Sequence, residues 1–339
     1  MAEQSTPQGR AVPIWAVLAA IIVLGCAVIW PRGTLNAAMF SVLGLVQVAP
    51  LVIPGILLAA WIIASGADAH IARVFEARRG RAIWAAAAIG AITPVCGVTV
   101  LPLMAGLLAA GVPLAPIMAF WLSSPVTDPA MLATTAATLG MSFAVGKTVA
   151  AFGLGLFGGA VTVLFARRVW SVSALRDNGF VGKLAPSCGT PLRFQGRIWQ
   201  DADRRARFQA QAMATTRLIL ICLLPAFAAE YALNATLQPE ALTQYVGQDS
   251  WYAIPLAVFV GAPAYIDGYA ALPLTRGLID HGMSQGAAMA FLVSGGVVSI
   301  WGALAIFPVL KLRPFLLYLV LAVIGSLIAG YGFEWVMAT

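Results

Sequence analysis

Polar residues interrupt an apolar stretch of the chain at Thr93, Pro94, Cys96, Gly97 and Thr99. Proline removes a backbone hydrogen-bond donor and glycine frees the backbone, so this pattern predicts a break in a helix. Inside a bilayer, the unpaired backbone groups of a break need protein, water or a ligand as partners. The expected chemistry is the binding of a small solute or ion in a cavity. The alternative is a kink whose polar groups bond the neighbouring backbone.

Two further polar stretches have the same character. One contains Tyr265, Asp267 and Gly268, and the other is Ser123-Ser124-Pro125-Val126-Thr127-Asp128. Ser294 is the counterpart of Ser123 in an internal repeat of the sequence. It is expected to line the same cavity, or to let two helices approach closely.

Three carboxylates, Asp128, Asp267 and Glu230, are candidates for coupling the movement of a solute to a proton or cation. A carboxylate inside a membrane is costly unless it is protonated, paired or hydrated, which makes such residues functional candidates. Two alternatives stay open, because Asp128 could cap a helix and Glu230 could lie at the membrane interface. Lys147 is expected to extend its ammonium group to the interface.

The composition predicts a membrane protein. Of 339 residues, 61% are apolar and 10% are charged, whereas roughly 25% are charged in an average soluble domain. Apolar runs of about 20 residues recur along the chain, and each can cross a bilayer. Lipid is therefore the expected solvent for most of the surface.

Other classes of protein are not expected. The net charge of +7 comes from basic residues in short loops beside apolar segments, so it indicates membrane orientation rather than nucleic-acid binding. Four scattered cysteines show no disulfide or zinc spacing, and no metal or cofactor is expected. No hydrolase or phosphate-binding motif is present, so no enzyme is expected. Two intramembrane aspartates leave an aspartyl protease as a minor alternative, although its glycine-flanked motif is missing.

The expected crossings are the apolar segments 11–30, 39–64, 114–139, 142–166, 215–236, 285–310 and 314–336. Segments 82–110 and 251–281 are apolar but broken, and each is expected to form a re-entrant hairpin. The loop 73–81 holds four arginines, and the loop 167–213 holds nine basic residues against three acidic ones. Both loops, and the N-terminus, are therefore expected in the cytoplasm.

The two broken segments are related by the internal repeat. At the constant offset that pairs Ser123 with Ser294, positions 90–123 and 261–294 share 13 of 34 residues without a gap. The predicted fold is an all-α polytopic membrane protein with an inverted repeat of helix, broken hairpin, helix, helix, plus an extra N-terminal transmembrane helix. The predicted divisions are 1–38 (tail and extra helix), 39–166 (first repeat), 167–213 (solvated cytoplasmic loop) and 214–339 (second repeat).

A family resemblance adds to this interpretation. The string Thr93-Pro94-Val95-Cys96-Gly97-Val98-Thr99-Val100-Leu101-Pro102-Leu103, followed by Phe120 and the polar stretch 123–129, resembles the predicted-permease family that includes the organoarsenical efflux permeases. Members of that family carry Thr-Pro-x-Cys-Ser-Cys before a Pro-Leu pair. The resemblance covers about residues 40 to 335 and implies a polytopic permease of the bacterial inner membrane. For some members of the family, the resemblance implies efflux of trivalent arsenicals that contact cysteine thiols.

The sequence departs from the family pattern at the first break. Gly97 and Val98 stand in place of the family's serine and second cysteine, so a two-thiol site for a soft metalloid is missing there. The predicted function is alternating-access transport of a small molecule or ion, with proton-coupled efflux of a metalloid as the specific form. A passive channel and a non-transporting scaffold also stay open, as does assembly into a homo-oligomer.

Overall fold

The computed structural model of the chain describes residues 25, 28, 30–67, 79–93, 100–109, 112–127, 129–176, 193–236, 252–261, 268–298, 303 and 306–339. These residues form helices joined by turns, and the one strand-like pairing among them is an isolated antiparallel bridge between Leu175 and Leu310. The predicted all-α class is confirmed. Most of the predicted first helix, 11–30, lies outside the described residues.

The helices fall into two series. The first consists of α2 (Pro31–Ser65), α4 (Arg79–Ile92), α5 (Leu101–Ala109), α6 (Leu114–Ser123), α7 (Pro129–Leu139) and α8 (Met141–Leu164), followed by the short α9 (Val169–Val172). The second consists of η1 (Ile198–Gln200), α11 (Ala202–Thr236), α13 (Ala253–Gly261), α14 (Gly268–Asp280), α15 (Gln285–Val297) and α17 (Leu312–Ala338).

The constant offset found in the sequence also relates the helix boundaries. The first residues of α2, α6 and α8 have the first residues of α11, α15 and α17 as their counterparts at the same offset that pairs Ser123 with Ser294. α2 and α11 also end at equivalent residues, and both contain 35 residues. The repeat thus extends well beyond the two broken segments in which the sequence identities are concentrated.

Local signals account for several of these boundaries. α2 begins at Pro31, whose fixed φ suits a first helical turn, and ends at Gly66, which adopts the left-handed conformation with φ 75°. Ser284 caps α15, because its hydroxyl oxygen accepts a hydrogen bond of 3.1 Å from the backbone N–H of Ala287.

One predicted crossing is wrong. The segment 114–139 is not a single helix, because α6 ends at Ser123, a turn follows, and α7 begins at Pro129. Proline lacks the backbone N–H that a helix needs, so Pro125 and Pro129 together interrupt the helix. In the second half, α15 ends at Val297, within the predicted segment 285–310. A helix break therefore occurs in the third element of each half.

Among the described residues, α8 and α17 are long and apolar enough to cross a membrane. α2 adds a third span if its two parts, Pro31–Gln47 and Val52–Ser65, which are bent by 63°, form one crossing. Pro50 and Pro54 lie at this bend. The other apolar helices are short, as expected for a protein built from discontinuous elements.

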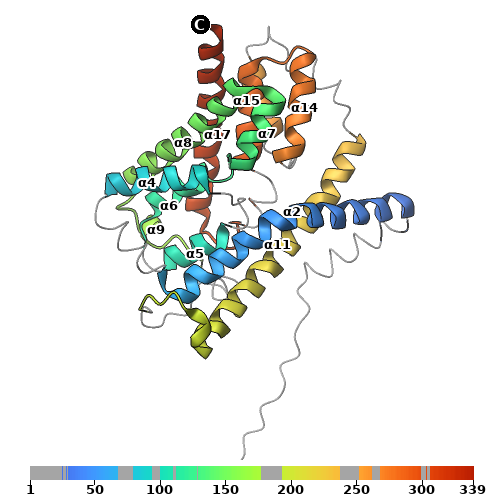
Figure 1. The fold of residues 1–339 in the computed structure, drawn as a ribbon. Coiled ribbons are helices and arrows are strands. Elements are labelled where there is room, and N and C mark those ends of the chain that lie inside the picture. The colour runs from blue at the N-terminus through green and yellow to red at the C-terminus, as the bar shows by residue number, and fades with distance from the viewer. Residues whose placement is uncertain are drawn as a thin grey trace, which may run out of the picture.

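α2 and α11 pack side by side and run antiparallel (Figure 1). The guanidinium of Arg204, near the start of α11, bonds the carbonyl oxygen of Ser65 at the end of α2. At the opposite ends, the ring of Phe40 lies 6.5 Å from that of Phe227 and 5.9 Å from that of Tyr231. Equivalent helices of the two halves thus point in opposite directions.

The remaining helices form two equivalent packing units. α4, α6 and α8 pack together in the first half, as α13, α15 and α17 do in the second. A Cβ added to Gly159 of α8 would lie 2.5 Å from Ile83 and 2.9 Å from Ala119, and a Cβ added to Gly330 of α17 would meet the equivalent Ile254 and Ala290 at 2.9 and 2.8 Å. Small residues at these positions let the helices approach closely.

α6 and α8 run antiparallel within the first unit. A Cβ at Gly155 would contact Ala119 and Ser123, whereas a Cβ at Gly159, one turn later on α8, would contact Ala115 and Ala119. Moving forward along α8 therefore moves the contacts backward along α6.

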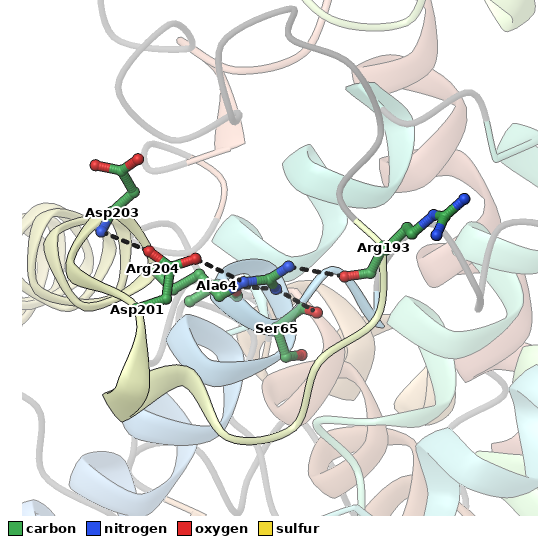
Figure 2. A network of polar contacts seen from close by, with 6 residues as sticks. All are labelled: Ala64, Ser65, Arg193, Asp201, Asp203 and Arg204. Atoms are coloured by element: carbon green, nitrogen blue, oxygen red, sulfur yellow. Dashed lines mark hydrogen bonds and ion pairs between the residues drawn. The ribbon is translucent and has the colours of Figure 1, made fainter.

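Part of the predicted solvated loop 167–213 is ordered against the membrane helices. α11 begins at Ala202 rather than at the predicted residue 215. Figure 2 shows the contact that fixes this segment: the Arg204 side chain donates hydrogen bonds to the carbonyl oxygens of Ala64 (3.3 Å), Ser65 (3.0 Å) and Arg193 (2.9 Å). A cation at the end of α2 also complements the helix dipole.

Neighbouring contacts extend this attachment. The carboxylate of Asp201 lies 3.4 Å from Nε of Arg204 and also accepts a hydrogen bond from the backbone N–H of Asp203. The indole N–H of Trp61 donates to the carbonyl oxygen of Gly196 at 3.3 Å. The segment 193–204 thus packs against the end of α2, a helix far away in the sequence, and these hydrogen bonds hold it there.

Candidate functional site

Equivalent residues of the two halves meet in the fold. A Cβ added to Gly296 would lie 3.0 Å from the carbonyl oxygen of its equivalent, Pro125. Leu154 and Gly325, also equivalent, touch where α8 packs on α17. In an object with two-fold symmetry, equivalent points touch only at the axis. These are the contacts expected of two halves related by an approximate two-fold axis.

The polar stretch of the first half lies against the end of α4, which leads into the first predicted break. The Thr127 hydroxyl donates a hydrogen bond of 2.9 Å to the carbonyl oxygen of Ala91. A Cβ added to Gly90 would lie 2.1 Å from Oγ of Ser123, which is fully buried. The start of the first break and the polar turn are therefore adjacent.

The second half repeats this arrangement. Gly261, the equivalent of Gly90, is the last residue of α13, and a Cβ added to it would lie 2.4 Å from Oγ of Ser294 and 2.7 Å from the carbonyl oxygen of Phe291. Ser294 is the equivalent of Ser123, and its hydroxyl donates to the same Phe291 carbonyl oxygen at 3.1 Å. The second predicted break begins directly after this contact.

These contacts define one region, which we call the junction: residues 123–127, residues 294–297 and the ends of α4 and α13. It joins both halves through the contact of Pro125 with Gly296. Its hydroxyl groups, from Ser123, Ser124, Thr127 and Ser294, are all buried. Hydroxyl and backbone carbonyl groups there could bind a polar solute or a cation.

Several predicted site residues lie outside the described part of the chain: Pro94, Cys96, Gly97, Thr99, Asp128, Tyr265 and Asp267. The described helices on either side of them in the sequence are α4 and α5, α6 and α7, and α13 and α14. Their assignment to the cavity stays a prediction.

Three other predicted residues belong to described elements. Thr93 follows α4 and is half-buried, and its hydroxyl donates to the carbonyl oxygen of Ile89, as expected for a kink. Ser124 is buried in the turn after α6. Glu230 belongs to α11, but its side chain lies outside what the structure describes.

Sequence reasoning missed an aromatic pair beside the junction. Tyr318 of α17 is buried, and its hydroxyl donates a hydrogen bond to the carbonyl oxygen of Val297. The Trp121 ring stacks on the Tyr318 ring with 4.9 Å between centroids. The indole N–H of Trp121 is buried without a hydrogen-bond partner among the residues described. Neither residue stands out in the sequence, because aromatic residues are common in apolar helices.

Lys147 differs from its prediction, because its side chain is buried within the protein instead of reaching out to a membrane interface. It lies in α8, and only 3% of its surface is exposed. A charged group within an apolar helix indicates a functional role more often than an anchoring role when it faces other helices. The sequence signal was present, since Lys147 is the one basic residue in the 24-residue helix.

The described residues contain no group of three or more His, Cys, Asp or Glu side chains that could hold a metal ion.

Comparison with known proteins complements the geometry of the junction. A family model described as predicted permease matches residues 34–335, which is most of the chain. The chain belongs to the predicted permease family.

Two curated relatives of the permease support this assignment. UPF0718 protein MJ0584 of Methanocaldococcus jannaschii is 26% identical over 292 residues, covering 73% of this chain and 80% of the relative. UPF0718 protein YcgR of Bacillus subtilis is 25% identical over 298 residues, covering 87% of this chain and 95% of the relative. No solved structure gives a significant match. The permease is thus a multi-pass membrane protein of a transporter family rather than of an enzyme family.

Proposed function

We propose that this permease moves a small solute across the bacterial inner membrane by alternating access, with the solute bound at the junction. The observation that carries the proposal is the contact of Pro125 with Gly296, beside the buried hydroxyls of both halves. Many secondary transporters bind their solute at the interface between two repeats, where discontinuous helices leave backbone groups free for the ligand.

The direction of the helices supports an inverted repeat. α2 and α11 are equivalent and run antiparallel, as helices of two oppositely oriented halves must. With the basic loops in the cytoplasm, the first half would begin outside the cell and the second half inside it at matching points. Rocking of one half against the other around the junction would then open the site alternately to each side.

Coupling to protons is assigned to Asp128 and Asp267, with Glu230 as the third candidate. Asn in place of Asp keeps the shape of the side chain but removes its charge, so Asp128→Asn and Asp267→Asn should each lower transport and weaken its dependence on pH. Normal transport by both variants, with no dependence on pH, would show that coupling occurs elsewhere.

The substrate class that we propose is a trivalent metalloid compound, exported from the cell. Support comes from the thiol of Cys96 in the first predicted break, since thiolates are preferred by soft ions, and from membership of the permease family. The break contains one thiol instead of the two of the family pattern. It would therefore favour a compound whose metalloid atom has fewer positions open to thiol ligands.

The deciding experiment is expression in a metalloid-sensitive bacterium, with survival and cell-associated metalloid measured for trivalent inorganic and organic arsenicals. Wild type should protect, Cys96→Ser and Asp128→Asn should lose protection, and Cys222→Ser should keep it as the control for thiol loss elsewhere. No protection despite confirmed membrane expression would reject metalloid efflux for the compounds tested.

Reconstitution separates a transporter from a channel. Proteoliposomes with an imposed proton gradient should accumulate the solute against its own gradient if transport is coupled. Dissipation of the solute gradient alone, together with measurable unitary conductance, would instead indicate a passive channel.

A further inference from the structure

Lys147 is buried in α8, and the proposed transport steps give it no role. α8 is one of the helices long and apolar enough to cross a membrane, and Lys147 is 3% exposed within it. An ammonium group in such surroundings is strongly unfavourable unless an opposite charge or several acceptors compensate it. A carboxylate partner is therefore the first feature to seek.

The register between α6 and α8 points to one carboxylate. A Cβ added to Gly155 would lie 2.7 Å from the carbonyl oxygen of Ala119 and 2.9 Å from Cβ of Ser123. Because the two helices are antiparallel, moving back along α8 from Gly155 to Lys147 leads past the end of α6 at Ser123 toward the turn that follows it. α7, which begins at Pro129 after that turn, packs on α8. Asp128 is the acidic residue between Ser123 and the first residues of α7.

The internal repeat gives an independent reason. The equivalents of Asp128 and Lys147 in the second half are Ser299 and Tyr318, so both charges are present in one half and both are absent in the other. Tyr318 donates its hydrogen bond to the carbonyl oxygen of Val297, whose equivalent is residue 126. By symmetry, the Lys147 position is next to the chain segment that contains Asp128.

We propose that Lys147 is the positioning countercharge of Asp128, forming an ion pair beside the junction in the first half alone. The ammonium group of Lys147 would hold the carboxylate of Asp128 in place while Asp128 is ionised. The inference deepens the proposed function, since it rests on Asp128 lining the site, but the pairing itself does not require that any solute be transported.

The test compares thermal unfolding of the purified full chain in detergent. Lys147→Met and Asp128→Asn should each lower the unfolding temperature, because each leaves one buried charge without its partner. The double variant D128N/K147M should recover most of the lost unfolding temperature. The double variant D128S/K147Y, which carries the residues found at the equivalent positions of the second half, should recover it as well. The double variant D267N/K147M, the matched control for the other candidate carboxylate, should not recover it.

Three results would overturn the pairing. The first is an unchanged unfolding temperature for Lys147→Met, and the second is recovery of that temperature in D267N/K147M instead of D128N/K147M. The third is no recovery in either D128N/K147M or D128S/K147Y. Because unfolding is measured without solute, a failure of the transport assays leaves this result unaffected, and the two proposals can be judged separately.

Cross-linking covers the case in which single variants do not fold. In a chain with its native cysteines replaced by serine, D128C/K147C removes both charges together and should form a disulfide, detected as protection from maleimide-polyethylene glycol. D128C/V149C is the matched control, since Val149 lies on the exposed face of α8. Equal protection of both pairs, or protection of neither, would contradict the proposed contact.

Discussion

Leu154 of α8 and Gly325 of α17 occupy equivalent positions in the two halves and lie against each other. A Cβ added to Gly325 would lie 1.7 Å from Cδ1 of Leu154, so a side chain at this position of α17 would force the Leu154 side chain to move. The rings of Phe143, near the start of α8, and Phe333, near the end of α17, lie 4.8 Å apart, so the two helices run antiparallel. The halves are therefore joined directly by helices that are long enough to cross a membrane.

This contact predicts a specific cross-link. With native cysteines replaced and a protease site inserted between residues 177 and 192, L154C/G325C should hold the two halves together after cleavage, as seen by gel electrophoresis without reductant. The control is G153C/G325C, because a Cβ at Gly153 has no neighbour within 4 Å. Separation of the halves in both variants would contradict the contact at this position.

Glycines of α8 should differ sharply in their tolerance of a methyl group. Gly155→Ala would place Cβ 2.7 Å from a backbone carbonyl oxygen, which cannot move alone, so we expect a loss of about 1–3 kcal/mol of stability from overpacking. Gly153→Ala, on the open side of the same helix, should be neutral or slightly stabilising. Thermal unfolding of both purified variants in detergent checks this, and equal stability would reject the close packing of α6 on α8.

The inverted orientation can be tested at the first residues of α8 and α17. Met141 and Leu312 are equivalent, and both side chains are exposed. With oppositely oriented halves, Met141→Cys should react with a membrane-impermeant maleimide from outside the cell, whereas Leu312→Cys should react after permeabilisation. Labelling of both from the same side would show that the two halves are not inverted.

Arg204 should be the most sensitive residue of the segment that follows the first half. Arg204→Met removes the donors for three backbone carbonyl oxygens, so we expect a loss of about 2–4 kcal/mol and faster proteolysis between residues 193 and 201. Arg204→Lys should rescue little, because an ammonium group cannot span the same acceptors. The neighbouring Arg205 is exposed, and Arg205→Met should behave as wild type. Equal protease resistance in all variants would show that the attachment contributes nothing.

The sequence determined the class of the protein and the position of its repeat. An excess of apolar residues allows no water-facing surface, and that excess is a property of composition alone. The constant offset of the repeat, found from identities around the broken segments, also relates both boundaries of α2 to those of α11 and the first residue of α8 to that of α17. Proline and glycine act on their own backbone, so they mark helix ends without knowledge of the rest of the fold.

The tertiary structure decided which side chains are buried and what they touch. An amphipathic lysine can reach the interface from many positions on a helix, so sequence reasoning placed Lys147 there, whereas packing against other helices buries it. Arg204 was assigned to a solvated loop because its partners, Ala64 and Ser65, are far away in the sequence. The contact between Pro125 and Gly296 also joins distant segments, since each half provides one of the two surfaces and neither carries a local signal for the other.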